Sequence, residues 1–293
     1  KALTDNSNVL IGVLVDYIFF VRHLGSFVAY FKVDILWDKF KRHVVNKNTD
    51  EYIAIVGKGF NCVPHGEFFN KVINATTDNM SAHDMEGAEI TWKDAHNNGW
   101  AMMDMRLPNV VKKIQTDKKE FSLMKRIIAL HGVDGTCSNT AIFGAIDFFC
   151  LNGQIRGNHD RVMRKNTAGL CMEKFASDLQ KSQQDFNEHA KQMQRWANSS
   201  LMQVNVKDLL KDIVKDANPE KMYSLYRSEV TNRGDNLFAL YSAFTNYATY
   251  ADEQNGFKLR ETGKDTQSVN MFKREISVAK WIETPQFRQL EAA

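Results

Sequence analysis

The spacing of apolar residues changes near residue 167, and this change constrains the fold more than any other feature of the sequence. Before it, the run 52–57 is β-branched and the residues of 100–107 alternate with the repeat of two that is typical of strands. After it, apolar residues recur every three or four positions, as on one face of a helix. This order predicts an α+β fold, with an antiparallel sheet in the first half and a helical second half.

The first half is expected to form two β-hairpins with one flanking helix. The linker of the first hairpin ends in Asn98-Gly99, a dipeptide typical of tight turns, and the second hairpin turns at 132–136. The expected elements, in chain order, are a strand at 52–57 that continues at 60–63, a helix at 66–75, and strands at 88–93, 99–107, 121–131 and 140–151.

The second half begins with a heptad-like apolar stripe from Met172 to Trp196, which predicts one long amphipathic helix. Asn205 and the pair Asn218-Pro219 are typical of helix starts. Further helices are expected at 206–217, from 219 onward, at 236–251 and at 268–281. The expected domains are an unassigned N-terminal segment at 1–44, a sheet domain at 45–167 and a helical region at 168–293.

The most apolar stretch, from Val9 to Val21, contains Asp16 and is too short for a membrane span, which needs roughly 20 apolar residues. A buried strand or helix is the preferred interpretation, and no membrane contact is expected. The four cysteines form no CxxC pair, which favours free thiols in a reducing cytoplasm. The first residue is Lys1 rather than Met, so the true start can lie upstream.

Motifs for known chemistry are missing. The sequence contains no phosphate-binding GxxxxGK[ST] loop, no HExxH, no GxSxG and no GxGxxG, and Gly57-Lys58-Gly59 is interpreted as a turn. His131 with Asp134 and His159 with Asp160 could contribute to a metal site, which needs three or four converging ligands. Nothing in the sequence brings them together, so we expect no catalytic residue, no metal and no cofactor, which favours a non-enzymatic protein.

Positive charge is concentrated in two places although the whole chain carries only +3. Residues 106–126 hold seven basic and two acidic side chains, and residues 156–165 hold four basic and one acidic. Such clusters can neutralise phosphates, although solvated surface charge is the simpler interpretation. The candidate nucleic-acid-binding residues are Lys112, Lys113, Lys125, Arg126, Arg156, Arg161, Arg164 and Lys165. Trp92, Trp100, Phe148 and Phe149 could stack on bases or belong to the core.

An ordered set of segments resembles a family of unknown function from phages, plasmids and prophages, often labelled "phage/plasmid-like protein". The segments are 51–63, the helix from Glu67 to Ile73, His131-Gly132-Val133-Asp134-Gly135-Thr136, Phe148-Phe149-Cys150-Leu151-Asn152, Arg164-Lys165-Asn166-Thr167 and the aromatic helix 236–250. Together they span about 45–285. Asn166 departs from the histidine expected there. The resemblance implies a role in mobile-element DNA processing, and the element order is analogous to Rad52/RecT-type single-strand annealing proteins.

Three functions follow from these observations. The first is a non-enzymatic, homo-oligomeric protein that binds and anneals single-stranded DNA. The second is a phage structural or assembly protein that touches no nucleic acid. The third is a metal-dependent nuclease that uses His131, Asp134, His159 and Asp160.

Overall fold

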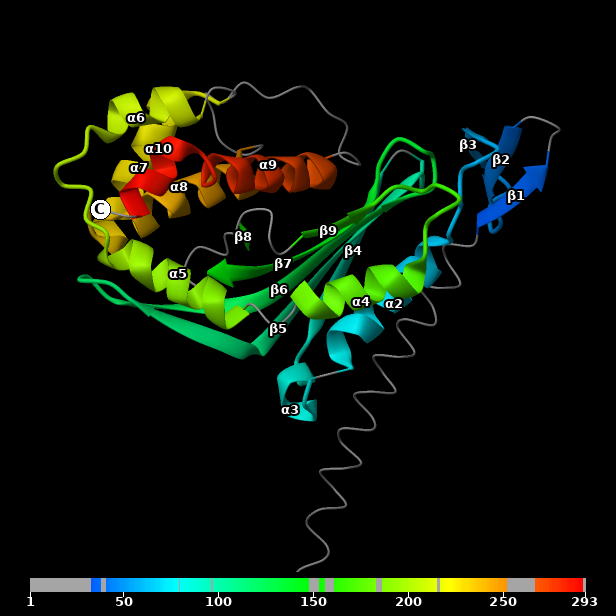
Figure 1. The fold of residues 1–293 in the computed structure, drawn as a ribbon, viewed down its shortest axis with the longest axis horizontal. Coiled ribbons are helices and arrows are strands. Elements are labelled where there is room, and N and C mark those ends of the chain that lie inside the picture. Colours follow the sequence, from blue (N-terminus) through cyan, green and yellow to red (C-terminus); the bar gives the residue numbers. More distant parts are fainter. Residues whose placement is uncertain are drawn as a thin grey trace, which may run out of the picture. The chain divides into compact units, whose positions relative to one another are not determined.

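The computed structural model describes residues 33–37, 41–78, 80–95, 97–147, 153–155, 161–182, 186–214, 217–251 and 267–291. They form an α+β fold, as the sequence predicts (Figure 1). The strands are β1 (Val33–Trp37), β2 (Lys41–Asn46), β3 (Tyr52–Gly57), β4 (Glu89–Ala95), β5 (Trp100–Gln115), β6 (Glu120–Gly132), β7 (Asn139–Asp147), β8 (Gly153–Ile155) and β9 (Arg161–Arg164). The helices are α2 (His65–Thr77), α3 (Ala82–Met85), α4 (Met172–Ser182), α5 (Phe186–Asn198), α6 (Val206–Ile213), α7 (Pro219–Arg233), α8 (Leu237–Tyr250), α9 (Gln267–Trp281) and α10 (Pro285–Glu291).

The chain separates into two compact units, and each is discontinuous in sequence. The described residues of the first unit fall within 33–109, 128–141 and 162–181, and those of the second within 110–127, 142–161 and 182–291. The three long strands β5, β6 and β7 contribute residues to both units. No unit boundary falls at residue 167, because the first unit continues from Val162 to Lys181 and so includes most of α4.

The larger sheet has the strand order β4-β5-β6-β7-β8, and β9 pairs with β7. Both expected hairpins are present, and β4 and β5 pair antiparallel from Glu89↔Arg106 to Ala95↔Trp100. The second strand of the first hairpin does not end at Leu107, because β5 continues to Gln115 and pairs with β6. A connection this short joins antiparallel strands, so the two expected hairpins merge into one meander.

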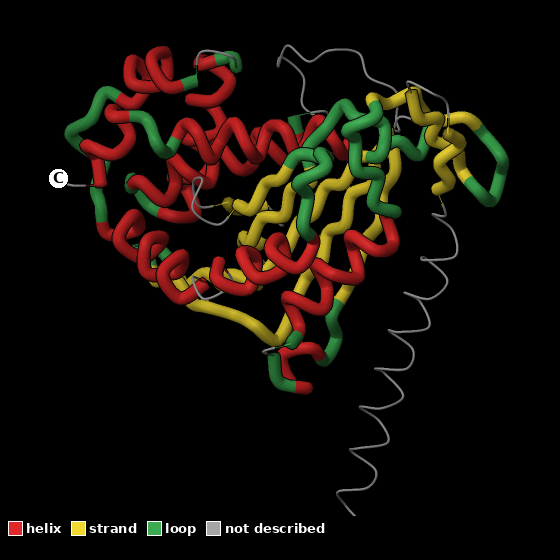
Figure 2. Tube along the Cα trace, turned by 45° about the vertical axis from the view of Figure 1, so that its right-hand side comes forward, coloured by secondary structure: helices red, strands yellow, loops and turns green. Residues whose placement is uncertain are grey.

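The smaller sheet has the antiparallel order β1-β2-β3 (Figure 2). Only β3 was predicted, and the strands β1 and β2 lie in or next to the segment left unassigned. Val44 and Val56 of this sheet pack with Val133 of the β6–β7 turn. The expected continuation of β3 at 60–63 is reduced to a single bridge between Phe60 and Thr167. The stretch Val9–Val21 lies outside the described residues.

In the first unit, α2 and α4 lie side by side (Figures 1 and 2). The predicted apolar face of α2 is buried at Phe68, Phe69, Val72 and Ile73. The ring centres of Phe68 and Phe175 are 5.2 Å apart, and the ammonium of Lys71 is 3.1 Å from Glu173. The spacing of apolar residues therefore identified both the helix and its buried face.

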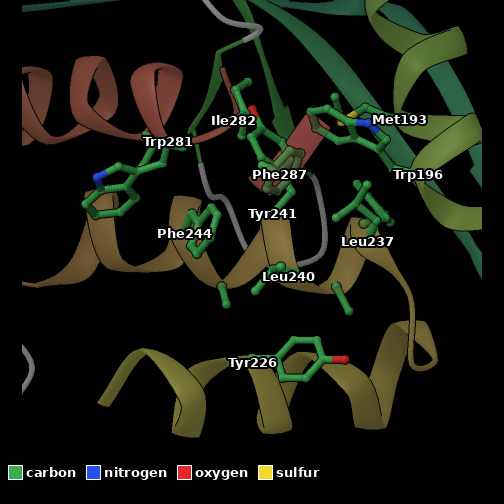
Figure 3. Packing of buried hydrophobic residues seen from close by; sticks show 14 of the residues in the cluster. Met193, Trp196, Tyr226, Leu237, Leu240, Tyr241, Phe244, Trp281, Ile282 and Phe287 are labelled. Carbon is green, nitrogen blue, oxygen red and sulfur yellow. The ribbon is translucent and has the colours of Figure 1, made fainter. Parts of the chain in front are cut away.

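The core of the second unit surrounds α8, in which Phe238, Tyr241, Phe244 and Tyr247 are buried (Figure 3). Tyr241 packs against Trp196 of α5, with ring centres 4.9 Å apart, and Phe244 packs against Trp281 of α9 at 5.4 Å. The predicted caps are confirmed at Asn205 and Asn218, and Asn236 caps α8 as well; each accepts a hydrogen bond from a backbone amide of the first turn. The helix after Asn205 ends at Ile213 rather than at 217, and α10 was not predicted.

The single long helix expected from Met172 to Trp196 is wrong in one respect. The structure has two helices, α4 and α5, which end and begin on either side of residues 183–185. Apolar residues of the stripe are buried in both helices, but those of α4 and those of α5 belong to the cores of different units. Phe175 is buried in the first unit, whereas Met193 and Trp196 are buried in the second. The repeat predicts the buried face of each helix but contains no information about which core covers it. None of the described helices is both long enough and apolar enough to cross a membrane.

Candidate functional site

The first basic cluster lies partly at the end of the β5–β6 hairpin, in the second unit. Lys112 is partly exposed and Lys113 is exposed on β5. The ammonium of Lys113 is 2.8 Å from Oε1 of Glu120 on β6. Ile114 and Phe121 are buried in the core of the second unit. The hairpin end therefore has a buried apolar side, while its lysines stay at the surface.

The turn between β5 and β6 is fixed by Thr116. Its hydroxyl oxygen accepts hydrogen bonds from the amides of Lys118 and Lys119, both at 3.2 Å. Lys118 is exposed, and the ammonium of Lys119 lies 5.0 Å from the ring centre of Phe121. Asp117 packs against Gly234 after α7, where φ is +84° and a Cβ would overlap the carboxylate. The turn thus places its acidic residue against the helix end and leaves Lys118 exposed.

Lys125 and Arg126, also in the predicted set, are buried. Their exposed fractions are 5% and 3%, although both follow the hairpin lysines in sequence. The ammonium of Lys125 is 5.3 Å from the ring centre of Phe143, and Nη1 of Arg126 is 2.8 Å from Oε1 of Glu275 on α9. Because a buried charge needs a partner, these side chains serve the interior of the second unit. The structure therefore removes both from the candidate interface.

The second basic cluster follows β9, in the first unit. The Arg164 guanidinium forms an ion pair with Asp178 of α4, and Lys165 is exposed. Arg156 lies outside the described residues, and Arg161 is placed in β9 without a described side chain. Arg164 and Lys165 belong to a different unit from Lys112 and Lys113. They are therefore treated as a separate surface.

Two segments that are distant in sequence pair next to Lys165, although the sequence suggested only a turn at 57–59. Phe60 and Thr167 form an antiparallel bridge, and the Asn61 amide donates to the Asn166 carbonyl at 3.3 Å. The Arg42 guanidinium also donates to the Phe60 carbonyl at 2.7 Å. This pairing brings together segments that are about a hundred residues apart, and no local pattern predicts it.

The tryptophans proposed for base stacking belong to the interior. Trp100 is 5% exposed, and its indole N–H donates to Oδ1 of Asp134 at 3.0 Å. Trp92 is half-buried, with its ring centre 5.1 Å from that of Phe69. The core interpretation holds for Trp100, whereas Trp92 contacts Phe69 and stays partly exposed. Phe148 and Phe149 lie outside the described residues.

His131 and Asp134 belong to a polar network at the β6–β7 turn of the first unit. Oδ1 of Asp134 accepts a hydrogen bond from the Thr136 amide at 2.9 Å, in addition to the one from Trp100. Asn166 donates to the Gly132 carbonyl at 2.7 Å and accepts from the Asn139 side-chain amide at 2.6 Å. The residue that stands in place of the expected histidine therefore holds the turn together.

The deepest part of this network is a pair of fully buried imidazoles, His65 of α2 and His131 of β6. Their Nδ1 atoms are 2.6 Å apart, and Nε2 of His65 is 2.9 Å from the Asn98 carbonyl. A carbonyl can only accept, so Nε2 of His65 donates and its Nδ1 accepts from His131. Nε2 of His131 then carries a lone pair and no hydrogen. This nitrogen has no hydrogen-bond partner among the described residues.

Both imidazoles are neutral at physiological pH. Burial lowers the pKa of His65 to about 4, although the nearby carboxylates of Asp134 and Asp94 oppose the shift. Burial, and then the neighbouring His65, lower the pKa of His131 well below its ordinary value. Within the described residues no group of three or more potential ligands could hold a metal ion. Of the four residues suggested for a nuclease, the structure describes His131 and Asp134. His159 and Asp160 lie outside the described residues.

The cysteines that the structure describes are free thiols, as expected: Cys62, Cys137 and Cys171. Burial raises the pKa of the Cys62 thiol to about 11, against a smaller opposing effect of the Arg42 charge. A thiol with this pKa is a weak nucleophile, because the thiolate is the reactive form. Cys62 is therefore a packing residue beside the smaller sheet.

Comparison with known proteins places the chain in a family. The sequence profile described as "Domain of unknown function (DUF932)" matches residues 52–275, which span β3 to α9 and so include elements of both units. No curated protein and no solved structure matches the chain. The match covers well over half of the sequence, and the chain belongs to the DUF932 family.

Proposed function

We propose that the protein binds single-stranded DNA and anneals complementary strands without catalysing a reaction, as a homo-oligomer that acts in mobile-element DNA processing. The observation that carries the proposal is the lysine-bearing end of the β5–β6 hairpin, formed by Lys112, Lys113, Lys118 and Lys119. Of its two acidic neighbours, Glu120 pairs with Lys113 and Asp117 packs against Gly234. In the part of the chain that the structure describes, neither Lys112 nor Lys118 forms an ion pair.

Phosphate binding suits this arrangement for a physical reason. The apolar side of the hairpin is buried, so its lysines are held on a rigid support rather than on a flexible tail. Each phosphate that a lysine neutralises releases condensed counterions, which gives affinity for nucleic acid without sequence preference. The modest total charge then fits a protein that binds through local surfaces. The buried, neutral His131 gives the nuclease alternative no comparable support.

Fluorescence anisotropy with a labelled oligodeoxythymidine at low salt tests the proposal. The lysine variant carries Lys112→Gln, Lys113→Gln, Lys118→Gln and Lys119→Gln. The helix variant, a matched control with the same loss of charge, carries Lys191→Gln, Lys207→Gln, Lys211→Gln and Lys221→Gln on the exposed surfaces of α5, α6 and α7.

The wild-type protein and the helix variant are expected to bind with similar affinity. The lysine variant is expected to bind at least about tenfold more weakly. Wild-type binding weaker than high micromolar would contradict the proposal and favour a structural protein that touches no nucleic acid. Strand cleavage with Mg²⁺ or Mn²⁺ that is lost in Asp134→Ala would favour the nuclease instead.

Annealing and assembly need separate measurements. Complementary labelled strands are expected to pair faster with the protein than alone, without a nucleotide cofactor. Light scattering and electron microscopy of the same sample are expected to show a homo-oligomer that carries the DNA. A monomer that binds DNA but does not accelerate pairing would leave binding in place and contradict annealing.

A further inference from the structure

The smaller sheet has two different faces. In an antiparallel pair, residues opposite each other share a face. Val44 lies opposite Ala54 and Arg42 opposite Val56, and this inner face packs on Val133. The outer face, formed by His43, Tyr52 and Ile55, is the other side of the same two strands.

The outer face is open although it carries large side chains. Tyr52 is 49% exposed and Ile55 is 48% exposed, and they are two of four large hydrophobic side chains that are exposed among the described residues. His43 lies opposite Ile55, and its ring centre is 6.1 Å from that of Tyr52. Two rings and one branched aliphatic side chain are therefore grouped on a sheet surface, where each ring has a face or an edge available.

Two exposed lysines, Lys41 and Lys58, lie at one end of this face. Lys41 lies opposite Gly57 and is exposed, and exposed Lys58 follows immediately. The glycines Gly57 and Gly59 have no atom within 4 Å of the position that a Cβ would occupy, so the surface beside these lysines is unobstructed.

The two acidic residues of the β2–β3 connection, Asp50 and Glu51, lie at the other end of the strands. Glu51 is engaged locally, since its carboxylate accepts a hydrogen bond from the Thr49 hydroxyl at 3.1 Å. The end at Lys41 and Lys58 is therefore positive and the rings lie between the two ends. A flat group with a π-face, attached to negative charges, complements this combination of rings and ammonium groups.

We propose that the outer face is a stacking site for the unpaired bases of single-stranded nucleic acid. Tyr52 and His43 would contact base faces, Ile55 would pack against their edges, and Lys41 and Lys58 would contact phosphates. This inference rests on the proposed function and adds to it a site that explains a preference for unpaired over paired strands, because only unpaired bases offer their faces.

The test compares two probes of equal length and charge: oligodeoxythymidine and an oligonucleotide with abasic sites in its centre. Stacking contributes about a fivefold to more than hundredfold gain in affinity per base when judged by alanine substitution. The wild-type protein is expected to bind the thymidine probe about tenfold more tightly, Tyr52→Phe to keep that ratio, and Tyr52→Ala to lower it towards one. The control Met202→Ala truncates a side chain that is 76% exposed and should leave the ratio unchanged.

The outcomes separate this site from the function on which it rests. If the wild-type protein binds neither probe, the proposed function fails and the stacking site fails with it. If it binds both but Tyr52→Ala keeps the wild-type ratio, DNA binding survives and the stacking site is overturned. The same holds if Tyr52→Ala changes only the oligomer mass, which would identify the outer face as a contact between copies. Loss of folding is detected by the circular dichroism spectrum, and His43→Ala with Ile55→Ala then provides the second test of the same ratio.

Discussion

The two turns that flank β6 use polar residues in opposite ways. The β5–β6 turn keeps Lys118 at the surface, and it buries Thr116 together with apolar neighbours such as Phe121. The β6–β7 turn buries His131 and Asn139 completely and ties them to α2 and to Asn166. One turn therefore presents charge to solvent, whereas the other uses neutral hydrogen-bonding groups to fix the backbone.

This difference shows why similar polarity in sequence leads to different roles. A buried polar group is costly unless it is hydrogen-bonded, so its neighbours in the fold must supply partners. An exposed lysine has no such requirement and remains available for a phosphate. Changes at the β6–β7 turn should therefore affect stability, and changes at the β5–β6 turn should affect binding.

The largest expected effect on stability comes from Trp100→Ala. The substitution removes a buried ring and leaves Asp134 without the indole donor, which should lower the free energy of unfolding by about 3–5 kcal/mol. Urea denaturation followed by circular dichroism measures the change. Trp100→Phe, which keeps most of the ring volume, should cost less. An unchanged unfolding midpoint in Trp100→Ala would show that this turn is not a stabilising centre.

Acidification should weaken the same turn through His65. Its folded pKa of about 4 lies below the ordinary value of 6.5, so the unfolded chain binds more protons between these limits. The stabilisation is present above pH 6.5 and is lost as pH falls towards 4, by about 3 kcal/mol for this residue alone. Denaturation midpoints between pH 7 and pH 4.5 measure the loss. The control His83→Gln, which changes an exposed histidine, should keep the wild-type pH dependence.

A direct check of the same prediction uses nitrogen-labelled histidine. The imidazole signals of His65 and His131 are expected to stay neutral from pH 7.5 to pH 5. Titration of all histidines near pH 6.5 would contradict the buried pair, whatever its effect on stability.

Asn166→Ala should have an intermediate effect. It removes the donor to the Gly132 carbonyl and the acceptor for Asn139, so two buried groups lose a partner at a cost of about 2 kcal/mol. Asn198→Ala, at the exposed end of α5, is the comparison. Equal unfolding midpoints for the two variants would mean that Asn166 does not hold the turn.

The smallest expected effect on stability is that of the lysine variant. Its side chains lie at the surface, so thermal unfolding should shift by no more than about 2 °C, even though DNA binding should fall. A shift as large as that of Asn166→Ala would mean that the lysines support the fold, and the contrast between the two turns would disappear.

Local patterns predicted most elements and few of the contacts between them. The apolar face of α2, the β4–β5 hairpin and the caps at Asn205 and Asn218 depend on nearby residues in the sequence, and all were predicted. The burial of Lys125 and Arg126 depends on Glu275, about 150 residues away, and the pairing of His65 with His131 depends on the packing of α2 on β6. Such distant partners leave no local pattern, so the candidate site could be predicted only in part.

The most direct test of the account is the salt dependence of single-stranded DNA binding. The slope of log Kd against log salt concentration counts the phosphates that are neutralised, with about 0.7 per phosphate for single strands. If the four hairpin lysines contact phosphates, the slope of the lysine variant should be smaller than that of the wild-type protein by about 2 to 3. Lys125 is buried, so Lys125→Met should keep the wild-type slope. Equal slopes for the wild-type protein and the lysine variant, or a reduced slope in Lys125→Met alone, would contradict it.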